Sequence, residues 1–146
     1  MSGELMSMEQ AKELVSKGYM CSQIVLAFFA EDLDLSLEDA LRVSAGFGGG
    51  MCDGQACGAV TGAIMAIGLK YGMVEAEDFR QLQECNEKVV LFNNKFREKY
   101  QSTVCKDLLG FNINDPVEKE KYSQEETLPK CLDYITGAIK IAGEIL

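Results

Sequence analysis

The hydrophobic residues of this chain recur at helical spacing over nearly its whole length, and no useful stretch shows the alternation of a β-strand. Helix start signals are also present, because Ser7 with Gln10 predicts a capping box and Ser36 precedes two acidic residues. The expected helices cover about residues 7–17, 20–31, 36–43, 56–71, 76–100 and 129–145. We therefore expect an all-α fold, a compact bundle of about six helices that forms a single domain over residues 1–146.

Small residues and one apolar stripe indicate how these helices pack. Gly58, Gly62 and Ala66 follow one another at four-residue intervals, which lets a second backbone approach closely. A single apolar stripe on the helix over 76–100 contains Phe79, Leu82, Cys85, Val89, Phe92 and Phe96. Residues 46–54 contain too many glycines for regular structure, and residues 112–126 read as a polar surface connection.

Charge and hydropathy exclude several classes of function. The formal net charge of −9 repels nucleic acids and anionic lipid surfaces. The longest apolar run, residues 56–69, is shorter than the roughly 20 residues of a membrane-spanning helix. The first residues show no secretion signal, so we expect a cytoplasmic protein, and in that reducing compartment cysteines are more often catalytic or metal-binding than structural.

The chain contains no histidine, which restricts its chemistry. Ser-His and Cys-His catalytic pairs, CxxCH haem attachment and histidine-ligated zinc or iron are all excluded. Proton transfer would fall to carboxylates, thiols, lysine or tyrosine, and a metal would be held by thiolates or carboxylates.

Four of the six cysteines occupy predicted helix starts: Cys21, Cys57, Cys105 and Cys131. The positive end of a helix dipole stabilises a thiolate, the form that attacks disulfides and binds metals. Cys57 has the richest context, since it follows the glycine-rich loop and two glycines leave its sulfur uncrowded. We expect Cys57 to be the attacking thiol. The other three, taken singly, are as compatible with packing as with chemistry.

The remaining two cysteines have weaker contexts. Cys52, five residues before Cys57, is equally compatible with a resolving thiol and with a bystander. Cys85 lies in the middle of the predicted long helix, where packing is the better interpretation. The glycine loop lacks a preceding strand and a following Gly-Lys-Ser/Thr, so nucleotide binding is not expected.

The order Cys21, then Cys57-Gly58-Ala59-Val60-Thr61-Gly62, then Cys105, then Cys131 resembles the C_GCAxxG_C_C family over essentially the whole chain. The resemblance implies a redox-active protein with these four functional cysteines, and it places Cys52 and Cys85 outside the pattern. Related domains joined to multihaem cytochromes make an iron–sulfur or other iron site a further implication of the resemblance.

Three hypotheses follow. The first is a thiol-dependent oxidoreductase that uses the four signature cysteines for thiol–disulfide exchange or electron transfer with a redox partner protein or a small thiol or disulfide. The second is a metal site formed by the same four cysteines, either an iron–sulfur cluster or a structural zinc, although no C-x2-C knuckle supports zinc. The third is a non-catalytic module whose glycine loop shapes a small-molecule pocket or the face of a homodimer.

Overall fold

The computed structural model describes residues 5–120 and 124–146, and within them it contains only helices and one isolated β-bridge. The α-helices are α1 (Met8–Ser16), α2 (Cys21–Ala30), α3 (Leu37–Ser44), α4 (Gly58–Tyr71), α5 (Phe79–Tyr100), α6 (Cys105–Leu109), α7 (Pro116–Glu120) and α8 (Gln124–Ile145). Shorter helical turns are η1 (Glu31–Leu33), η2 (Ala45–Phe47) and η3 (Gly50–Gly54). The predicted all-α fold is confirmed, and six of these helices are longer than two turns, as the sequence predicted.

The predicted helix caps are present. The Ser7 hydroxyl accepts a hydrogen bond from the Gln10 N–H at 3.1 Å, and the Gln10 side chain accepts one from the Ser7 N–H at 2.9 Å. The Ser36 hydroxyl accepts the Asp39 N–H at 3.1 Å and begins α3. After α1, Gly18 adopts a φ of +96°, a conformation that glycine tolerates better than other residues, and the chain turns into α2.

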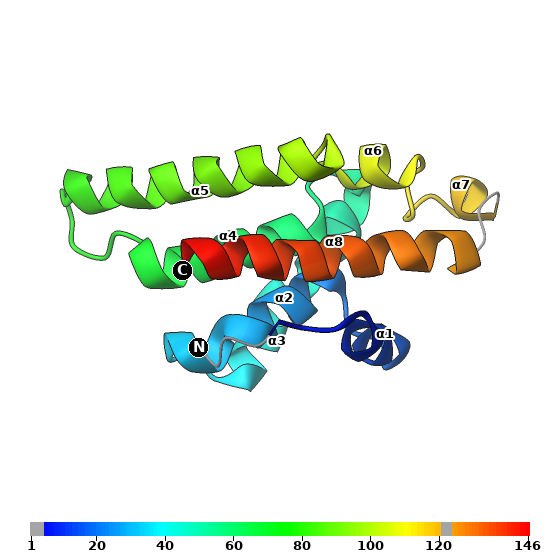
Figure 1. Ribbon diagram of the computed structural model, residues 1–146, viewed down its shortest axis with the longest axis horizontal. Helices are drawn as coiled ribbons and strands as arrows, with labels where there is room; N and C mark the ends of the chain where they lie inside the picture. The colour runs from blue at the N-terminus through cyan, green and yellow to red at the C-terminus, as the bar shows by residue number, and fades with distance from the viewer. Residues whose placement is uncertain (1–4, 121–123) are drawn as a thin grey trace.

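Helix α4 is the centre of the bundle and packs against α2, α5 and α8. Figure 1 shows α5 along one side of α4 and α8, with α2 and α3 on the other side. A helix covered on several sides must be apolar around its circumference. Accordingly, α4 carries a single charged residue, Lys70, close to its end. No helix in the described part of the chain is both long and apolar enough to cross a membrane.

The predicted close approach of two helices occurs between α2 and α4. A Cβ atom added at Gly62 would lie 2.7 Å from the Ser22 carbonyl oxygen, and one added at Gly58 would lie 2.9 Å from the Ser22 backbone nitrogen. The Ser22 hydroxyl, fully buried, donates to the Ser44 carbonyl at 2.8 Å and ties α2 to the end of α3. The close approach at Gly58 and Gly62 places the start of α2, and therefore Cys21, beside the start of α4.

Two expectations about helix faces and ends were wrong. The stripe on α5 reaches the core only in its later part, since Phe92 and Phe96 are fully buried but Phe79 is 67% exposed. Helix α8 begins at Gln124, well before the expected start at Pro129. Proline favours the first turn of a helix because it lacks an N–H donor, but here it occupies the second turn.

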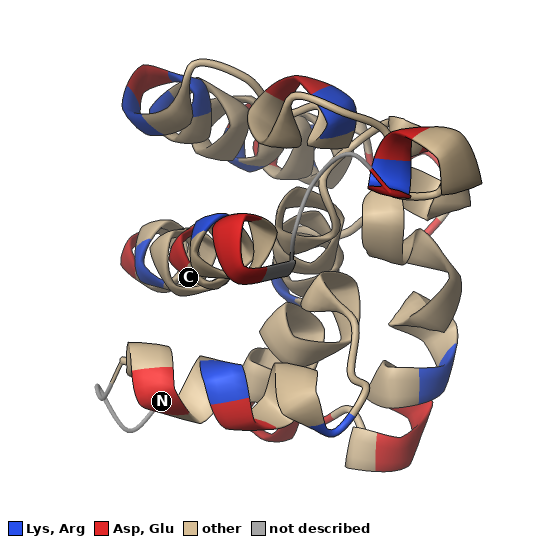
Figure 2. Cartoon of the chain, turned by 90° about the vertical axis from the view of Figure 1, so that its right-hand side faces the viewer, with Lys and Arg blue, Asp and Glu red and all other residues tan. Residues whose placement is uncertain are grey.

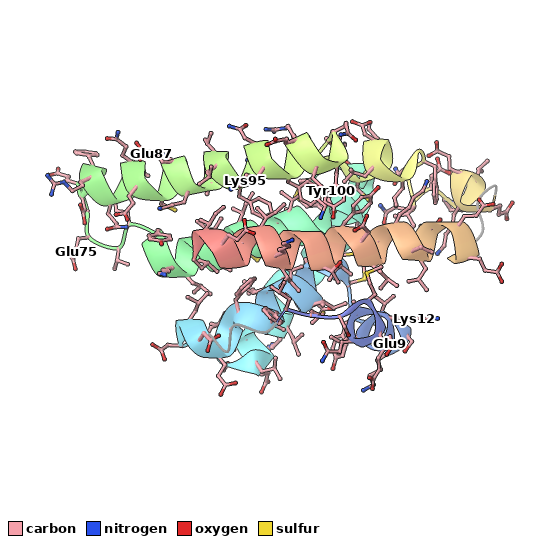
Figure 3. The ribbon with its side chains drawn as sticks, in the orientation of Figure 1. Glu9, Lys12, Glu75, Glu87, Lys95 and Tyr100 are labelled. Atoms are coloured by element: carbon pink, nitrogen blue, oxygen red, sulfur yellow. The ribbon has the colours of Figure 1, made fainter. Side chains whose placement is uncertain are left out.

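The expected polar connection over residues 112–126 contains an additional short helix, α7, before residues 121–123, which lie outside the described residues. Near the middle of α8, the Asp133 carbonyl accepts a hydrogen bond at 3.0 Å from Tyr100, the last residue of α5, so α5 and α8 are joined by a side chain as well as by packing (Figure 3).

Candidate functional site

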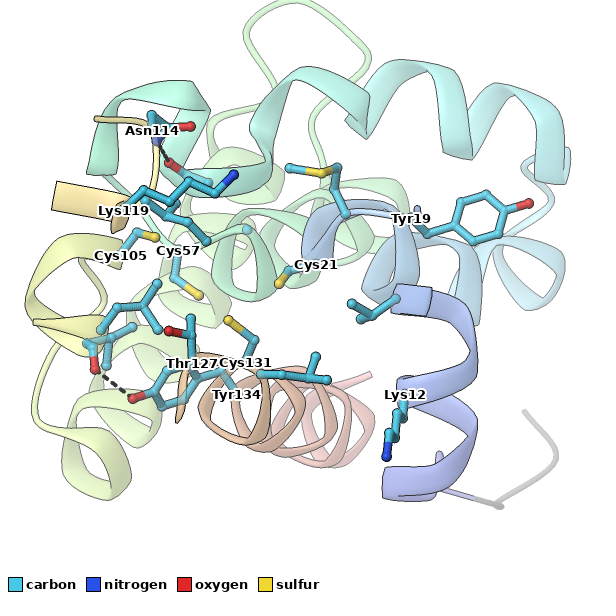
Figure 4. Close-up of a pocket in the computed structure, with 18 of the residues that line it drawn as sticks. Lys12, Tyr19, Cys21, Cys57, Cys105, Asn114, Lys119, Thr127, Cys131 and Tyr134 are labelled. Carbon is cyan, nitrogen blue, oxygen red and sulfur yellow. Dashed lines mark hydrogen bonds between the residues drawn. The ribbon is translucent and has the colours of Figure 1, made fainter. Parts of the chain in front are cut away.

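The four signature cysteines line one cavity of about 620 Å³, whereas Cys52 and Cys85 do not line it. Cys21 is the first residue of α2, Cys57 is the N-cap of α4, Cys105 is the first residue of α6, and Cys131 lies on α8. Figure 4 shows their sulfur atoms pointing toward a common space. All four are free thiols in this structure. Segments that are far apart in sequence therefore bring four sulfurs together.

An antiparallel bridge between Ala56 and Val104 positions two of these cysteines. The Cys57 N–H donates to the Thr103 carbonyl at 2.8 Å, and the Cys105 N–H donates to the Gln55 carbonyl at 2.6 Å. Cys57 and Cys105 each follow the bridge by one residue, so both point to the face opposite the bridged pair, because side chains alternate along extended chains. The bridge therefore directs both thiols to the same cavity.

The glycine-rich loop makes this pairing possible. Gly50 has a φ of +68°, and a Cβ atom added to it would lie 2.9 Å from the Cys105 Cβ. Met51 and Cys52 also adopt left-handed conformations, and Cys52 is exposed. The loop is thus irregular, as its sequence predicted, and it holds Cys52 away from the cavity, so this structure gives it no partner for a resolving role.

Cys21 and Cys131 lie beside each other in the cavity, close enough for a hydrogen bond from the Cys21 thiol to be the first cause of the pKa shifts of both groups. Both side chains are half-buried, whereas Cys57 and Cys105 are buried. The prediction that Cys131 begins a helix was wrong, because it is the eighth residue of α8. The other three helix starts were predicted correctly.

The thiol pKa values do not follow the predicted rule that a helix start lowers them. Burial raises the pKa of Cys57 to about 11, although hydrogen bonds from the Ala59 and Val60 backbone act in the opposite direction. Burial likewise raises the pKa of Cys105 to about 12. The cost of desolvating a thiolate thus exceeds the stabilisation that a helix N-terminus supplies.

Cys131 is the exception. Its pKa is lowered, first by the hydrogen bond from Cys21 and also by the positive charge of Lys130, despite the opposing effect of burial. The pKa of Cys21 is raised well above its ordinary value, first because of its hydrogen bond to Cys131 and then because of burial. The pair therefore consists of one thiol that ionises readily and one that keeps its proton.

Sequence reasoning missed several residues that line the cavity, among them Tyr134, Lys12 and Lys119. Tyr134 follows Cys131 by three residues on the same helical face, and its hydroxyl donates to the Leu108 carbonyl at 2.9 Å, joining α8 to α6. Lys12 of α1 and Lys119 of α7 are exposed residues at the cavity. The spacing from Cys131 could have identified Tyr134, but Lys119 belongs to the segment interpreted as a solvated connection.

The arrangement of ligands does not fit a bound metal. Over residues 5–120 and 124–146, no group of three or more cysteine or carboxylate side chains is placed so that it could hold a metal ion. The four cysteines supply thiolate donors of a suitable type, but they are not placed as a group that could hold an ion.

The raised pKa of Cys57 predicts a loss of stability at alkaline pH. A thiol that ionises at about 11 when folded and near 9 when unfolded stabilises the fold fully below pH 9, and this contribution is lost as the pH rises to 11. We expect the free energy of unfolding to fall by about 2 kcal/mol more in the natural protein than in Cys57→Ser, whose hydroxyl does not ionise there. Urea unfolding between pH 7 and pH 11 measures this difference, with Cys85→Ser as the control. Equal losses in the natural protein and Cys57→Ser would contradict the assignment.

A family model described as "Putative redox-active protein (C_GCAxxG_C_C)" matches residues 19–145. The match includes all four cysteines at the cavity. None of the curated proteins and none of the solved structures compared with the chain gives a significant match.

Proposed function

Because this chain belongs to the C_GCAxxG_C_C family of redox-active proteins, we propose that it catalyses thiol–disulfide exchange, with Cys131 as the attacking thiol and Cys21 as the resolving thiol. The observation that carries the proposal is the placement of these two half-buried thiols beside each other on the lining of one cavity. Contact between a readily ionised thiol and a protonated one is the arrangement that a dithiol oxidoreductase requires.

The exchange proceeds in two balanced steps. The Cys131 thiolate forms a bond with one sulfur of a substrate disulfide, the substrate S–S bond breaks, and one substrate thiolate leaves and is protonated. Cys21 then loses its proton, its sulfur bonds to the Cys131 sulfur, and the second substrate thiol leaves. The protein gives up two electrons and two protons and gains a disulfide. The substrate disulfide becomes two thiols, and the reverse reaction regenerates the dithiol.

Two features support Cys131 rather than Cys57 as the attacking thiol. Cys131 is half-buried and Cys57 is 5% exposed. Only Cys131 among the four has a lowered pKa. The thiolate is the nucleophile in exchange, so the thiol that ionises more readily and is easier to reach attacks first. Cys57 and Cys105 are buried thiols on the same cavity. We propose that they exchange electrons with Cys21 and Cys131 by thiol–disulfide exchange.

We place this activity in the cytoplasm, where thiol pools keep such cysteines reduced. The proposed partners are small thiols and disulfides that enter the cavity, or a redox partner protein that reaches its opening. The competing hypothesis assigns Cys21, Cys57, Cys105 and Cys131 to an iron–sulfur or other metal site. Their convergence on one cavity favours this hypothesis. Against it, the described residues contain no group of three or more such side chains placed so that it could hold a metal ion.

Mapping the disulfide formed on oxidation tests the proposal. The fully reduced protein, purified without oxygen, is treated with one equivalent of a small disulfide, alkylated, digested and examined by mass spectrometry. We expect a Cys21–Cys131 disulfide to form first and two electrons to be transferred per chain. Stoichiometric iron or zinc in the anaerobic protein, with loss of the ion on oxidation, would instead establish the metal site. If serine at all four positions changed only stability, the cavity would be a binding or structural module.

A further inference from the structure

The charged residues that line the cavity are basic, although the chain as a whole is acidic. The protein has 23 acidic and 14 basic residues, yet the charged residues that line the cavity in the described part of the chain are Lys12 and Lys119. Figure 4 shows these two lysines on opposite sides of the four cysteines, with the amine of Lys119 extending over the space above Cys57. Lys130 adds positive charge beside Cys131. Figure 2 views this end of the molecule and shows charged residues of both signs on the surrounding helices.

The remaining lining is mainly apolar and sized for a small molecule. Its apolar side chains include Val15, Leu108, Leu109, Ile113 and Leu128. The volume of about 620 Å³ falls within the range of small-molecule sites, and the half-buried thiols lie inside it. Small-molecule sites of this kind are largely apolar and carry a few polar groups that set orientation and specificity. The lysines are the groups that would select the charge of the occupant.

We propose that the cavity selects small disulfides that carry negatively charged groups, such as carboxylates, and directs their sulfur atoms to Cys131. This proposal rests on the proposed thiol–disulfide exchange and names its substrate class. The net charge of −9 opposes the approach of an anion, so a preference for anionic substrates can arise only from the local field of the cavity. The chemistry is the exchange already described, with two anionic thiols as the products.

Three small disulfides of similar size test the charge preference: dithiodipropionate with two carboxylates, hydroxyethyl disulfide with none, and cystamine with two ammonium groups. The rate of oxidation of the reduced protein by each is divided by the rate of the same disulfide with free mercaptoethanol, which removes differences in intrinsic reactivity. At low salt we expect the normalised rate with dithiodipropionate to exceed that with cystamine by about 10-fold or more, and the ratio to shrink at high salt.

Lysine variants locate the source of the preference. The double variant K12Q/K119Q should reduce the ratio to about 2-fold or less, whereas K140Q, which changes an exposed lysine of α8 outside the cavity, should leave it near the natural value. Equal normalised rates for the three disulfides, or a preference retained in K12Q/K119Q, would overturn the proposed substrate class while exchange itself stands. If none of the three disulfides oxidised the protein, the proposed function would fail as well.

Discussion

Replacing Cys131 with serine should lower the rate constant for reaction with a small disulfide by at least about 100-fold. A serine hydroxyl fits the same space on α8 but does not ionise at neutral pH, so the first bond to the substrate sulfur cannot form there. Cys57, with its pKa raised to about 11, and the protonated Cys21 are poor substitutes. Stopped-flow measurement of thiol release under pseudo-first-order conditions gives this rate constant, and Cys85→Ser, outside the cavity, should react like the natural protein.

Two substitutions of Cys21 separate its proposed roles. Cys21→Ala removes both the resolving sulfur and the hydrogen-bond donor to Cys131, whereas Cys21→Ser retains a hydroxyl that can donate. Both variants should stop at a mixed disulfide on Cys131. Alkylation of Cys131 should require a higher pH in Cys21→Ala than in Cys21→Ser, because only the serine continues to stabilise the thiolate. If Cys131→Ser reacted normally and Cys57→Ser did not, Cys57 would be the attacking thiol, as its sequence context predicts.

The sequence predicted those features of the site that depend on local signals. Each of these signals lies within a few residues of the feature that it determines. The sequence therefore predicted the helix caps, the glycine-rich loop and the three cysteines at helix starts. The fourth cysteine, Cys131, was wrongly predicted to begin a helix because Pro129 precedes it. Proline is common in the first turn of a helix, and the sequence alone does not distinguish that position from one further inside the helix. The consequence is chemical, since Cys131 gains its low pKa from a side-chain contact and a neighbouring lysine rather than from a helix N-terminus.

Contacts between distant segments could not be predicted in this way. The raised pKa of Cys105 depends on burial under surrounding elements, which no local pattern specifies. The contact of Cys21 with Cys131 joins residues at opposite ends of the chain. The spacing of Gly58 and Gly62 predicted that another backbone would approach α4, but it did not identify α2 as that backbone or show that the approach positions Cys21.

The close contact between α2 and α4 predicts a large loss of stability when a side chain is added there. Gly62→Ala should lower the free energy of unfolding by about 3 kcal/mol, because the added Cβ would lie 2.7 Å from the Ser22 carbonyl oxygen and backbone must move to admit it. Gly68→Ala adds the same atom to the same helix, but nothing lies within 4 Å of its Cβ. It should therefore stabilise the protein by about 0.5 to 1 kcal/mol, since alanine is the better helix former. Urea unfolding of the two variants compares them directly.

The same pair of variants tests whether helix packing controls the chemistry. The backbone that Gly62→Ala displaces is that of Ser22, the residue after Cys21, so the shift should lengthen the contact between Cys21 and Cys131. Resolution of the mixed disulfide should then slow, while Gly68→Ala, far from this contact, should resolve it at the natural rate. If Gly62→Ala unfolded at the same urea concentration as the natural protein and resolved normally, the α2–α4 contact would not be what holds the two thiols together. A variant that is less stable but resolves normally would show that the thiol pair is held independently of that contact.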